Sequence, residues 1–67
     1  MNKSIVVLAM YDRLADGRNL KLEQCIAEYR ISLPTFRRYL ALLRDYCLEA
    51  HGREIVYDKM EKCYRLR

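Results

Sequence analysis

Apolar residues recur at helical spacing from residue 4 to residue 48, and this pattern predicts three helices. The helices are expected to span about residues 4–16, 22–29 and 33–48. Two later runs alternate with period two around a short polar turn, and they predict a β-hairpin with strands at about 54–58 and 62–67. The turn, Lys59-Met60-Glu61, has no Asn-Gly pair, so a loop of four or five residues is expected. The pattern therefore predicts one α+β domain over residues 1–67.

The third predicted helix carries the most specific pattern. Ser32 suits the N-cap, because its hydroxyl can accept a backbone N–H of the first turn, where Pro34 needs no N–H of its own. One face is an apolar stripe made of Phe36, Leu40, Leu43 and Cys47. The opposite face holds Pro34, Arg38 and Ala41, with Thr35 and Arg37 at its margins. An extension of this helix by one turn, as far as Gly52, is also compatible with the sequence.

The first predicted helix is apolar on more than one face. Its core stripe is Val7, Met10, Tyr11 and Leu14. Asn2 or Ser4 is the expected N-cap, and Gly17 is expected to end the helix in the left-handed conformation. Ile5 and Leu8 lie on the reverse side, so a second packing partner is expected. Either the C-terminal hairpin covers them, or they form the contact of a homodimer.

The hairpin is expected to have an apolar inner face and a basic exterior. The inner face would consist of Ile55, Tyr57, Tyr64 and Leu66. Arg65 and Arg67 would point outward, with Lys59 and Lys62 near the tip. Two short helices joined by about three residues, the second one basic, are typical of a helix-turn-helix. With a hairpin after them, the elements predict a small winged helix-turn-helix.

Composition excludes several classes of protein. No apolar run approaches the roughly 18 residues of a membrane span, so the sequence predicts a cytoplasmic protein with no membrane partner. Cys25, Cys47 and Cys63 are odd in number and widely spaced, which fits core residues in a reducing compartment. A metal site of Cys47, His51 and Cys63 is a weaker alternative, since zinc ligands are usually paired more closely. No cofactor and no small-molecule ligand are predicted.

Charge separates the two halves of the chain. The net charge is +4, and residues 1–29 hold four basic and four acidic side chains, whereas residues 30–67 hold nine and five. A basic half in a small domain attracts polyanions, of which nucleic acid is the commonest. Catalysis is not expected, because the single histidine and the scattered carboxylates form no acid–base or nucleophile pattern. The charge therefore favours a DNA-binding protein.

The third helix and the hairpin are the predicted DNA contacts. An α-helix fits the major groove, where an arginine can bridge the O6 and N7 atoms of guanine. Arg38 is central and suits a base edge or a deep phosphate, while Arg37 suits a phosphate. The hairpin would follow the backbone or enter the minor groove. The predicted interface consists of Ser32, Pro34, Thr35, Arg37, Arg38, Ala41, Lys59, Lys62 and Arg65.

Two stretches resemble a known family. Glu-Tyr-Arg-Ile-Ser-Leu-Pro-Thr-Phe-Arg-Arg-Tyr-Leu is similar to the turn and recognition helix of the DeoR-like and WYL-domain bacterial transcription regulators, and Glu-Ile-Val-Tyr-Asp with Cys-Tyr-Arg-Leu is similar to their wing. The resemblance covers nearly the whole chain. It implies that Ser32 caps the recognition helix and that Thr35, Arg37 and Arg38 sit at the DNA. Arg30 departs from the pattern, since related proteins often have Gly or an acidic residue there.

The predicted function is sequence-specific binding of double-stranded DNA by a small bacterial or phage transcriptional regulator acting as a dimer. No effector-sensing domain follows Arg67, so either a stand-alone regulator or an excised domain is expected. One alternative is a winged-helix interaction module or accessory subunit, which would use Leu33, Pro34 and Leu42 as an apolar contact patch. Another is an excisionase-like architectural protein, which would bend its DNA site.

Overall fold

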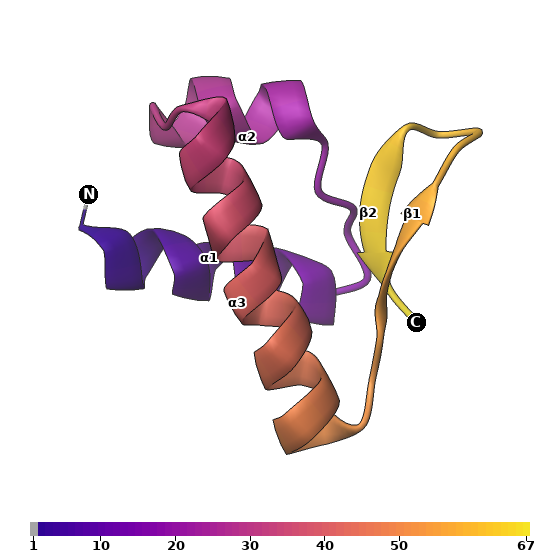
Figure 1. The fold of residues 1–67 in the computed structure, drawn as a ribbon. Helices are drawn as coiled ribbons and strands as arrows, with labels where there is room; N and C mark the ends of the chain where they lie inside the picture. Colours follow the sequence, from indigo (N-terminus) through magenta and orange to yellow (C-terminus); the bar gives the residue numbers. More distant parts are fainter. Residues whose placement is uncertain (1) are drawn as a thin grey trace.

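Three helices and one antiparallel hairpin make up residues 2–67, which the computed structural model describes (Figure 1). The elements are α1 (Lys3–Ala15), α2 (Leu22–Tyr29), α3 (Leu33–His51), β1 (Ile55–Asp58) and β2 (Cys63–Leu66). This confirms the predicted α+β order of three helices followed by a hairpin. Met1, which the predicted domain included, lies outside the described residues. Within residues 2–67, no helix combines the length and the apolar character that crossing a membrane requires.

Side-chain caps and glycines set the bounds of α1 and α3. The Asn2 Oδ1 atom accepts the Ile5 N–H at 3.0 Å, so Asn2 is the cap of α1. Gly17 follows α1 at φ +79°, as expected, while Arg18 donates its N–H to the Arg13 carbonyl. Helix α3 runs past residue 48 to His51 and ends where Gly52 takes φ +63°. The longer form of the third helix is therefore the one observed.

Helix α2 has neither a side-chain cap at its start nor a glycine at its end. Lys21 stands at its N-cap and makes no side-chain capping hydrogen bond. Arg30 ends the helix in the left-handed region, at φ +53° and ψ +50°, and its N–H donates to the Ile26 carbonyl. The N–H of Ile31 donates to the same carbonyl at 3.2 Å, which completes the turn into α3. An arginine therefore occupies a backbone conformation that favours glycine.

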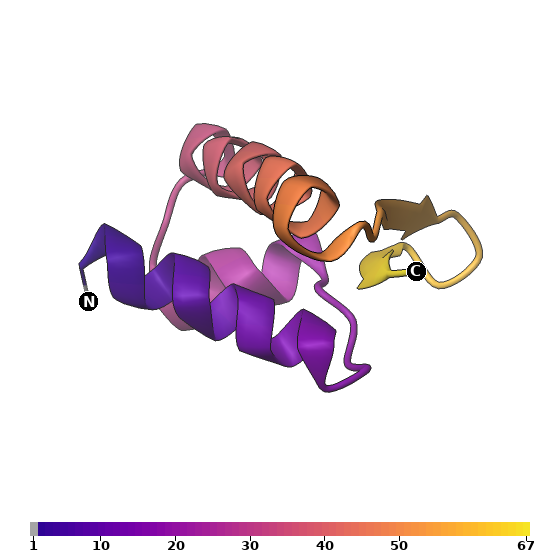
Figure 2. The same cartoon turned by 90° about the horizontal axis from the view of Figure 1, so that it is seen from below.

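The core lies where the three helices meet, and the hairpin closes one end of it (Figure 2). Two details of the expected stripes are wrong. In α1 the buried residues are Val6, Met10 and Leu14, while Val7 and Tyr11 are only partly buried. In α3 Tyr39 is buried together with Phe36, Leu40, Leu43 and Cys47, although the expected stripe did not include it. Val7 and Tyr11 are less buried than expected because they line an open groove between α1 and α3.

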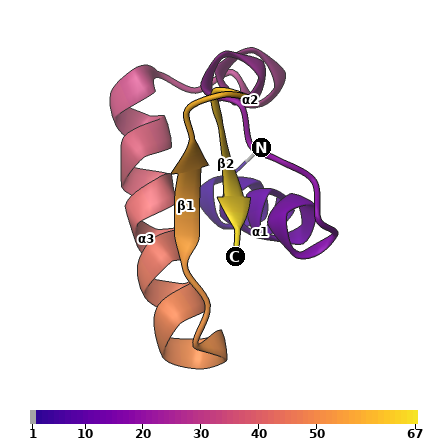
Figure 3. The same cartoon turned by 90° about the vertical axis from the view of Figure 1, so that its right-hand side faces the viewer.

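The hairpin joins the helices through backbone hydrogen bonds as well as side chains. Strand β1 pairs with β2 with Ile55 opposite Leu66 and Tyr57 opposite Tyr64. Leu20 and Tyr64 exchange two backbone hydrogen bonds of 2.8 Å, so the connector before α2 forms a bridge at the outer edge of β2. Figure 3 shows β1 beside α3 and β2 toward α1 and α2. The hairpin of β1, β2 and the turn between them, which we call the wing, is thus fixed next to α3.

The expected inner face of the hairpin is only partly correct. Ile55 is buried and Tyr64 and Leu66 are partly buried, whereas Tyr57 is 48% exposed. Tyr57 lies toward the tip, across an open cleft from the start of α2, and packs on the Tyr64 ring at 4.9 Å between centroids. Side chains alternate along β2, so Cys63 lies on the face of the hairpin opposite Tyr64 and Leu66, and it is fully buried.

The hairpin does not cover the second apolar face of α1. Ile5 is 51% exposed and Leu8 is 61% exposed. Coverage of these two residues by the C-terminal strands, one of the two expected explanations, is therefore wrong. Their exposure leaves this side of α1 free for another contact.

Candidate nucleic-acid interface

The first half of α3 brings most of the predicted site residues together on one exposed surface. Consecutive residues of a helix point about 100° apart, so Pro34, Arg38 and Ala41 share the side opposite the buried stripe. All three are exposed, and Arg37 is exposed on the flank of this side. We call Pro34, Arg37, Arg38 and Ala41 the outer face of α3. It combines two small side chains with two cationic ones.

Hydrogen bonds organise the start of α3. The Ser32 Oγ atom accepts the Thr35 N–H at 3.3 Å and donates its own proton to the Thr35 Oγ1 atom at 3.0 Å. The Arg38 guanidinium donates to the same Thr35 Oγ1 atom at 3.4 Å, which draws its head group toward the helix N-terminus. Residues near the N-terminus of a recognition helix reach deepest into the major groove. Arg38 is therefore held at the end of the helix where such a contact is made.

The backbone at the start of α3 has little to offer a phosphate. The Thr35 N–H is taken by Ser32, and the Phe36 N–H donates to the Ser32 carbonyl at 2.9 Å. Pro34 has no N–H, so Leu33 holds the remaining N–H of the first turn. Contacts from this region must therefore come mainly from side chains.

Arg44 belongs to the same surface, although sequence reasoning missed it. It follows Arg37 by seven residues, which is close to two helical turns, so both arginines lie on the side of α3 that faces the wing. Its guanidinium carbon lies 5.9 Å from the centre of the Tyr64 ring. The spacing of Arg37 and Arg44 could have identified it, but its nearness to the wing depends on the tertiary fold. Arg44 links the basic side of α3 to the hairpin.

Within the described part of the chain, residues 2–67, the arginines of α3 form no ion pair. The ion pairs among residues 2–67 are Arg13 with Glu28, Arg18 with Asp16, Arg65 with Asp58, and Arg67 with Glu54. None of them involves Arg37, Arg38 or Arg44, and all three side chains are exposed. An unpaired, exposed guanidinium keeps its donors available for a phosphate or a base edge.

The wing tip depends on Asp58. Its Oδ1 atom accepts the N–H groups of Met60 and Glu61 at 2.9 and 3.1 Å, and its Oδ2 atom lies 3.2 Å from the Arg65 guanidinium. Arg65 was predicted to face DNA, but the strand register places it diagonally across from Asp58, with which it pairs. Its first role is therefore to support the turn. Lys59 and Lys62 remain exposed at the tip, and Lys62 has φ +54°.

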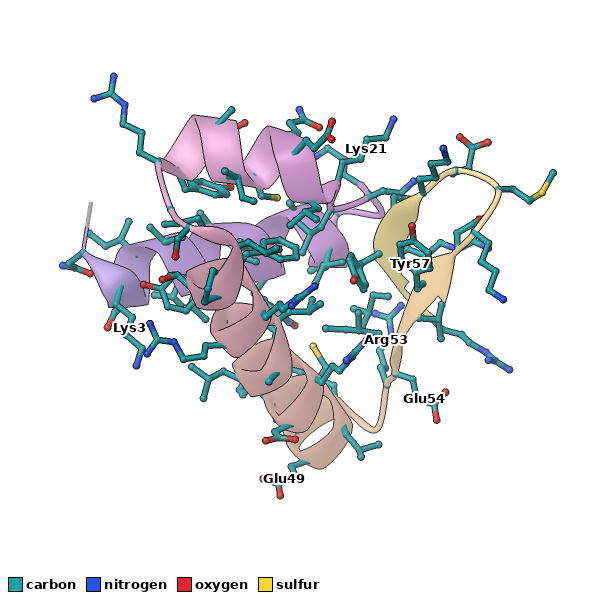
Figure 4. All side chains as sticks on the ribbon, turned by 45° about the horizontal axis from the view of Figure 1, so that its top comes forward. Lys3, Lys21, Glu49, Arg53, Glu54 and Tyr57 are labelled. Atoms are coloured by element: carbon teal, nitrogen blue, oxygen red, sulfur yellow. The ribbon has the colours of Figure 1, made fainter. Side chains whose placement is uncertain are left out.

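A cleft of about 570 Å³ separates the wing tip from the start of α2. Figure 4 shows Lys21 at the start of α2 and Tyr57 on the wing, on the two sides of this cleft. Lys21 and Lys62 line the cleft together with Glu23 and Glu61. The acidic and basic side chains balance, so the cleft adds no preference for an anion. The basic surface is centred on α3.

The cysteines and the histidine do not form a chemical centre. All three cysteines are free and buried, and burial raises the pKa of the Cys25 and Cys47 thiols, which disfavours the reactive thiolate. The His51 Nε2 atom lies 3.1 Å from the Tyr11 hydroxyl and 3.3 Å from the Tyr46 hydroxyl. No three potential metal ligands come together within residues 2–67. The structure therefore does not assemble the metal site considered from the sequence.

The apolar patch expected for an interaction module is divided. Leu33 and Leu42 are nine residues apart, which places them half a turn apart on opposite sides of α3. Leu42 lies beside α1 instead, where it lines a groove with Leu8 and Tyr46.

Comparison of the chain with protein-family models, with curated proteins and with solved structures finds no match. The resemblance to the DeoR-like and WYL-domain regulators therefore stays a prediction.

Proposed function

We propose that the protein binds double-stranded DNA in a sequence-specific manner, with α3 in the major groove and the wing on the adjacent backbone or minor groove. The observation that carries this proposal is the set of unpaired, exposed arginines Arg37, Arg38 and Arg44 on α3, beside a capped helix start and a basic wing. The resemblance of the sequence to bacterial regulators supports a role as a small bacterial or phage transcriptional regulator.

The side chains of α3 divide into two roles. Pro34 and Ala41 are small, so they let the helix backbone approach the floor of the groove. Arg38 lies between them on the outer face, and it is the candidate for bridging the O6 and N7 atoms of guanine. Arg37 and Arg44 lie toward the wing and suit phosphates, which position a protein but carry no sequence information.

The wing adds charge rather than specificity. Lys59 and Lys62 project from a turn that Asp58 holds in place. Arg30, at the turn before α3, is a further exposed cation that takes part in none of the ion pairs within residues 2–67. Each such cation that displaces counterions from a phosphate makes binding more dependent on salt.

The first experiment selects bound sequences from a random duplex pool and then measures fluorescence anisotropy of the enriched duplex at several salt concentrations. We expect enrichment of a defined sequence. We also expect the salt slope to fall by about 1 for each phosphate contact removed in the variants Arg37→Ala and Arg44→Ala. Arg18→Ala is the matched control, because Arg18 is an exposed arginine on the α1–α2 connector that already pairs with Asp16. Its slope should equal that of the wild type.

A second measurement separates base reading from phosphate binding. Arg38→Ala should cost about 1–3 kcal/mol on the enriched duplex and much less on a scrambled one. Arg37→Ala should weaken both duplexes about equally. No enrichment of any sequence, together with salt slopes that are the same in the α3 variants and in Arg18→Ala, would refute the proposed function.

A further inference from the structure

An apolar groove of about 510 Å³ lies between α1 and α3. Val7, Leu8 and Tyr11 line it from α1, and Leu42, Leu43 and Tyr46 line it from α3. Its rim is open to solvent, since Leu8 is 61%, Leu42 47% and Tyr46 49% exposed. Ile5 precedes Leu8 by one helical turn and extends the apolar surface along α1. A contiguous exposed apolar patch with a hollow at its centre is typical of a protein contact.

One wall of the groove is rigid. The rings of Tyr11 and Tyr46 meet edge to face at 5.4 Å, and both hydroxyls lie within 3.3 Å of the His51 Nε2 atom. A side chain that is already held in place loses little entropy when a partner packs on it. Tyrosine is also among the residues that dominate the energy of protein interfaces. The wall formed by Tyr11 and Tyr46 is therefore organised before any partner arrives.

We propose that this groove is the contact surface of a homodimer, in which the Leu8 and Leu42 side chains of each copy pack into the groove of the other. The inference rests on the proposed function in one respect, since a single small DNA-binding module buries little surface and gains affinity by pairing. The contact itself is argued from the groove. It extends the expectation that Ile5 and Leu8 form a dimer contact by adding Leu42 and Tyr46 from α3.

The charges around the groove suit a two-fold arrangement. Figure 4 shows Lys3 at the start of α1 and Glu49 near the end of α3, at opposite ends of this region, and Asp12 also lines the groove. When the two-fold axis of a dimer crosses the line from Lys3 to Glu49 at a right angle, the patch meets itself in the reverse direction along that line. The basic end of one copy then lies near the acidic end of the other, which favours pairing.

The position of the groove leaves most of the DNA-binding surface free. Leu42 points about 100° away from Ala41 and about 140° away from Arg37, whereas Arg38 lies one turn before Leu42 and about 40° away, at the margin between the groove and the outer face of α3. Arg44, which lies beside the Tyr64 ring of the wing, points about 160° away from Leu42. The dimer contact is therefore on one flank of α3 and the wing on the other. Arg37 and Arg44 of both copies therefore stay exposed, and Arg38 lies at the edge of the contact.

Sedimentation equilibrium of the full chain without DNA tests this proposal. We expect the wild type to reach twice the mass of one chain as its concentration rises, and Leu8→Glu and Leu42→Glu to remain monomeric. Leu48→Glu is the matched control, because Leu48 is a 57% exposed leucine of the same helix that points about 120° away from Leu42. Circular dichroism establishes that each variant is folded, which is expected because the replaced side chains are at least 47% exposed.

A wild type that stays monomeric up to about 1 mM would overturn the proposal, since even a weak complex forms there. So would a dimer that Leu48→Glu disrupts as strongly as Leu42→Glu. The outcome is separate from that of DNA binding. If the protein is monomeric but binds duplex DNA, only the proposed dimer is refuted. If it forms a dimer that Leu42→Glu disrupts but binds no duplex, only the proposed function is refuted.

Discussion

Replacing Arg30 by glycine should stabilise the protein, because Arg30 has the backbone conformation of a glycine. Its φ of +53° and ψ of +50° lie in the left-handed region, where the Cβ atom of an ordinary residue costs about 1–2 kcal/mol. The exposed Arg30 side chain takes part in none of the ion pairs within residues 2–67, so no such contact is lost. The backbone hydrogen bonds to the Ile26 carbonyl do not need the side chain.

The expected gain is smaller than the full cost of the strained backbone. Glycine makes the unfolded chain more flexible, which offsets about 0.4–1 kcal/mol. The net increase in the free energy of unfolding is therefore about 0.5–1 kcal/mol, which corresponds to a rise in Tm of roughly 2–8 °C for a domain of this size. Thermal unfolding followed by circular dichroism, with urea denaturation at 25 °C, measures both quantities.

Arg30→Ala separates the backbone effect from the loss of charge. Alanine also removes the guanidinium but keeps the Cβ atom at positive φ, so it should give no comparable gain. Equal stability of the glycine and alanine variants would refute the reasoning. The proposed function adds an opposite expectation for affinity, because both variants remove an unpaired cation from the turn before α3. Arg30→Gly should then fold more stably and bind duplex more weakly than the wild type.

Two further predictions concern the wing and the dependence of stability on pH. Asp58→Ala leaves two turn N–H groups and Arg65 without their acceptor, so it should destabilise the protein by about 1 kcal/mol in urea denaturation, while Asp45→Ala on the surface of α3 should change less than 0.5 kcal/mol. Burial raises the pKa of Cys25 above its ordinary 9.0 and that of Tyr29 above its ordinary 10.0, so the unfolded chain loses these protons first. Below about pH 9 these two groups should therefore not change the free energy of unfolding, and above it that free energy should fall as the pH rises. The fall should be smaller in Cys25→Ala, which lacks the buried thiol. A free energy of unfolding that rises above about pH 9 would contradict this prediction.

Local signals in the sequence were sufficient for the ends of α1 and α3. Asn2, Gly17, Ser32 and Gly52 each act within a few residues of the chain, through a side-chain hydrogen bond or a left-handed backbone, so their effect can be predicted without the fold. The strong conformational preferences of these residue types also explain why the element order was predictable. Arg30 gives no such signal, since arginine has no preference for the left-handed conformation that it takes here.

Contacts between distant elements could not be predicted in the same way. The pairing of Arg65 with Asp58 depends on the register of β1 and β2, and the burial of Tyr39 depends on how the neighbouring elements pack around α3. Arg44 lies at the wing only because the hairpin returns to α3. In each case the residue type was compatible with both a surface and a contact position, and the tertiary fold decided between them.

One helix, α3, packs in the core and also carries the two proposed contact surfaces. Leu40, Ala41 and Leu42 are consecutive, and the 100° between neighbours directs them to the core, to the proposed DNA face and to the groove beside α1, respectively. A core stripe that occupied more of the circumference would leave too little of α3 for both exposed surfaces. Because Leu42 is half-exposed while Leu40 is buried, a polar residue at position 42 should interrupt the proposed dimer without unfolding the protein, whereas one at position 40 should unfold it. The separation of these roles is what allows DNA binding and dimer formation to be tested independently on the same helix.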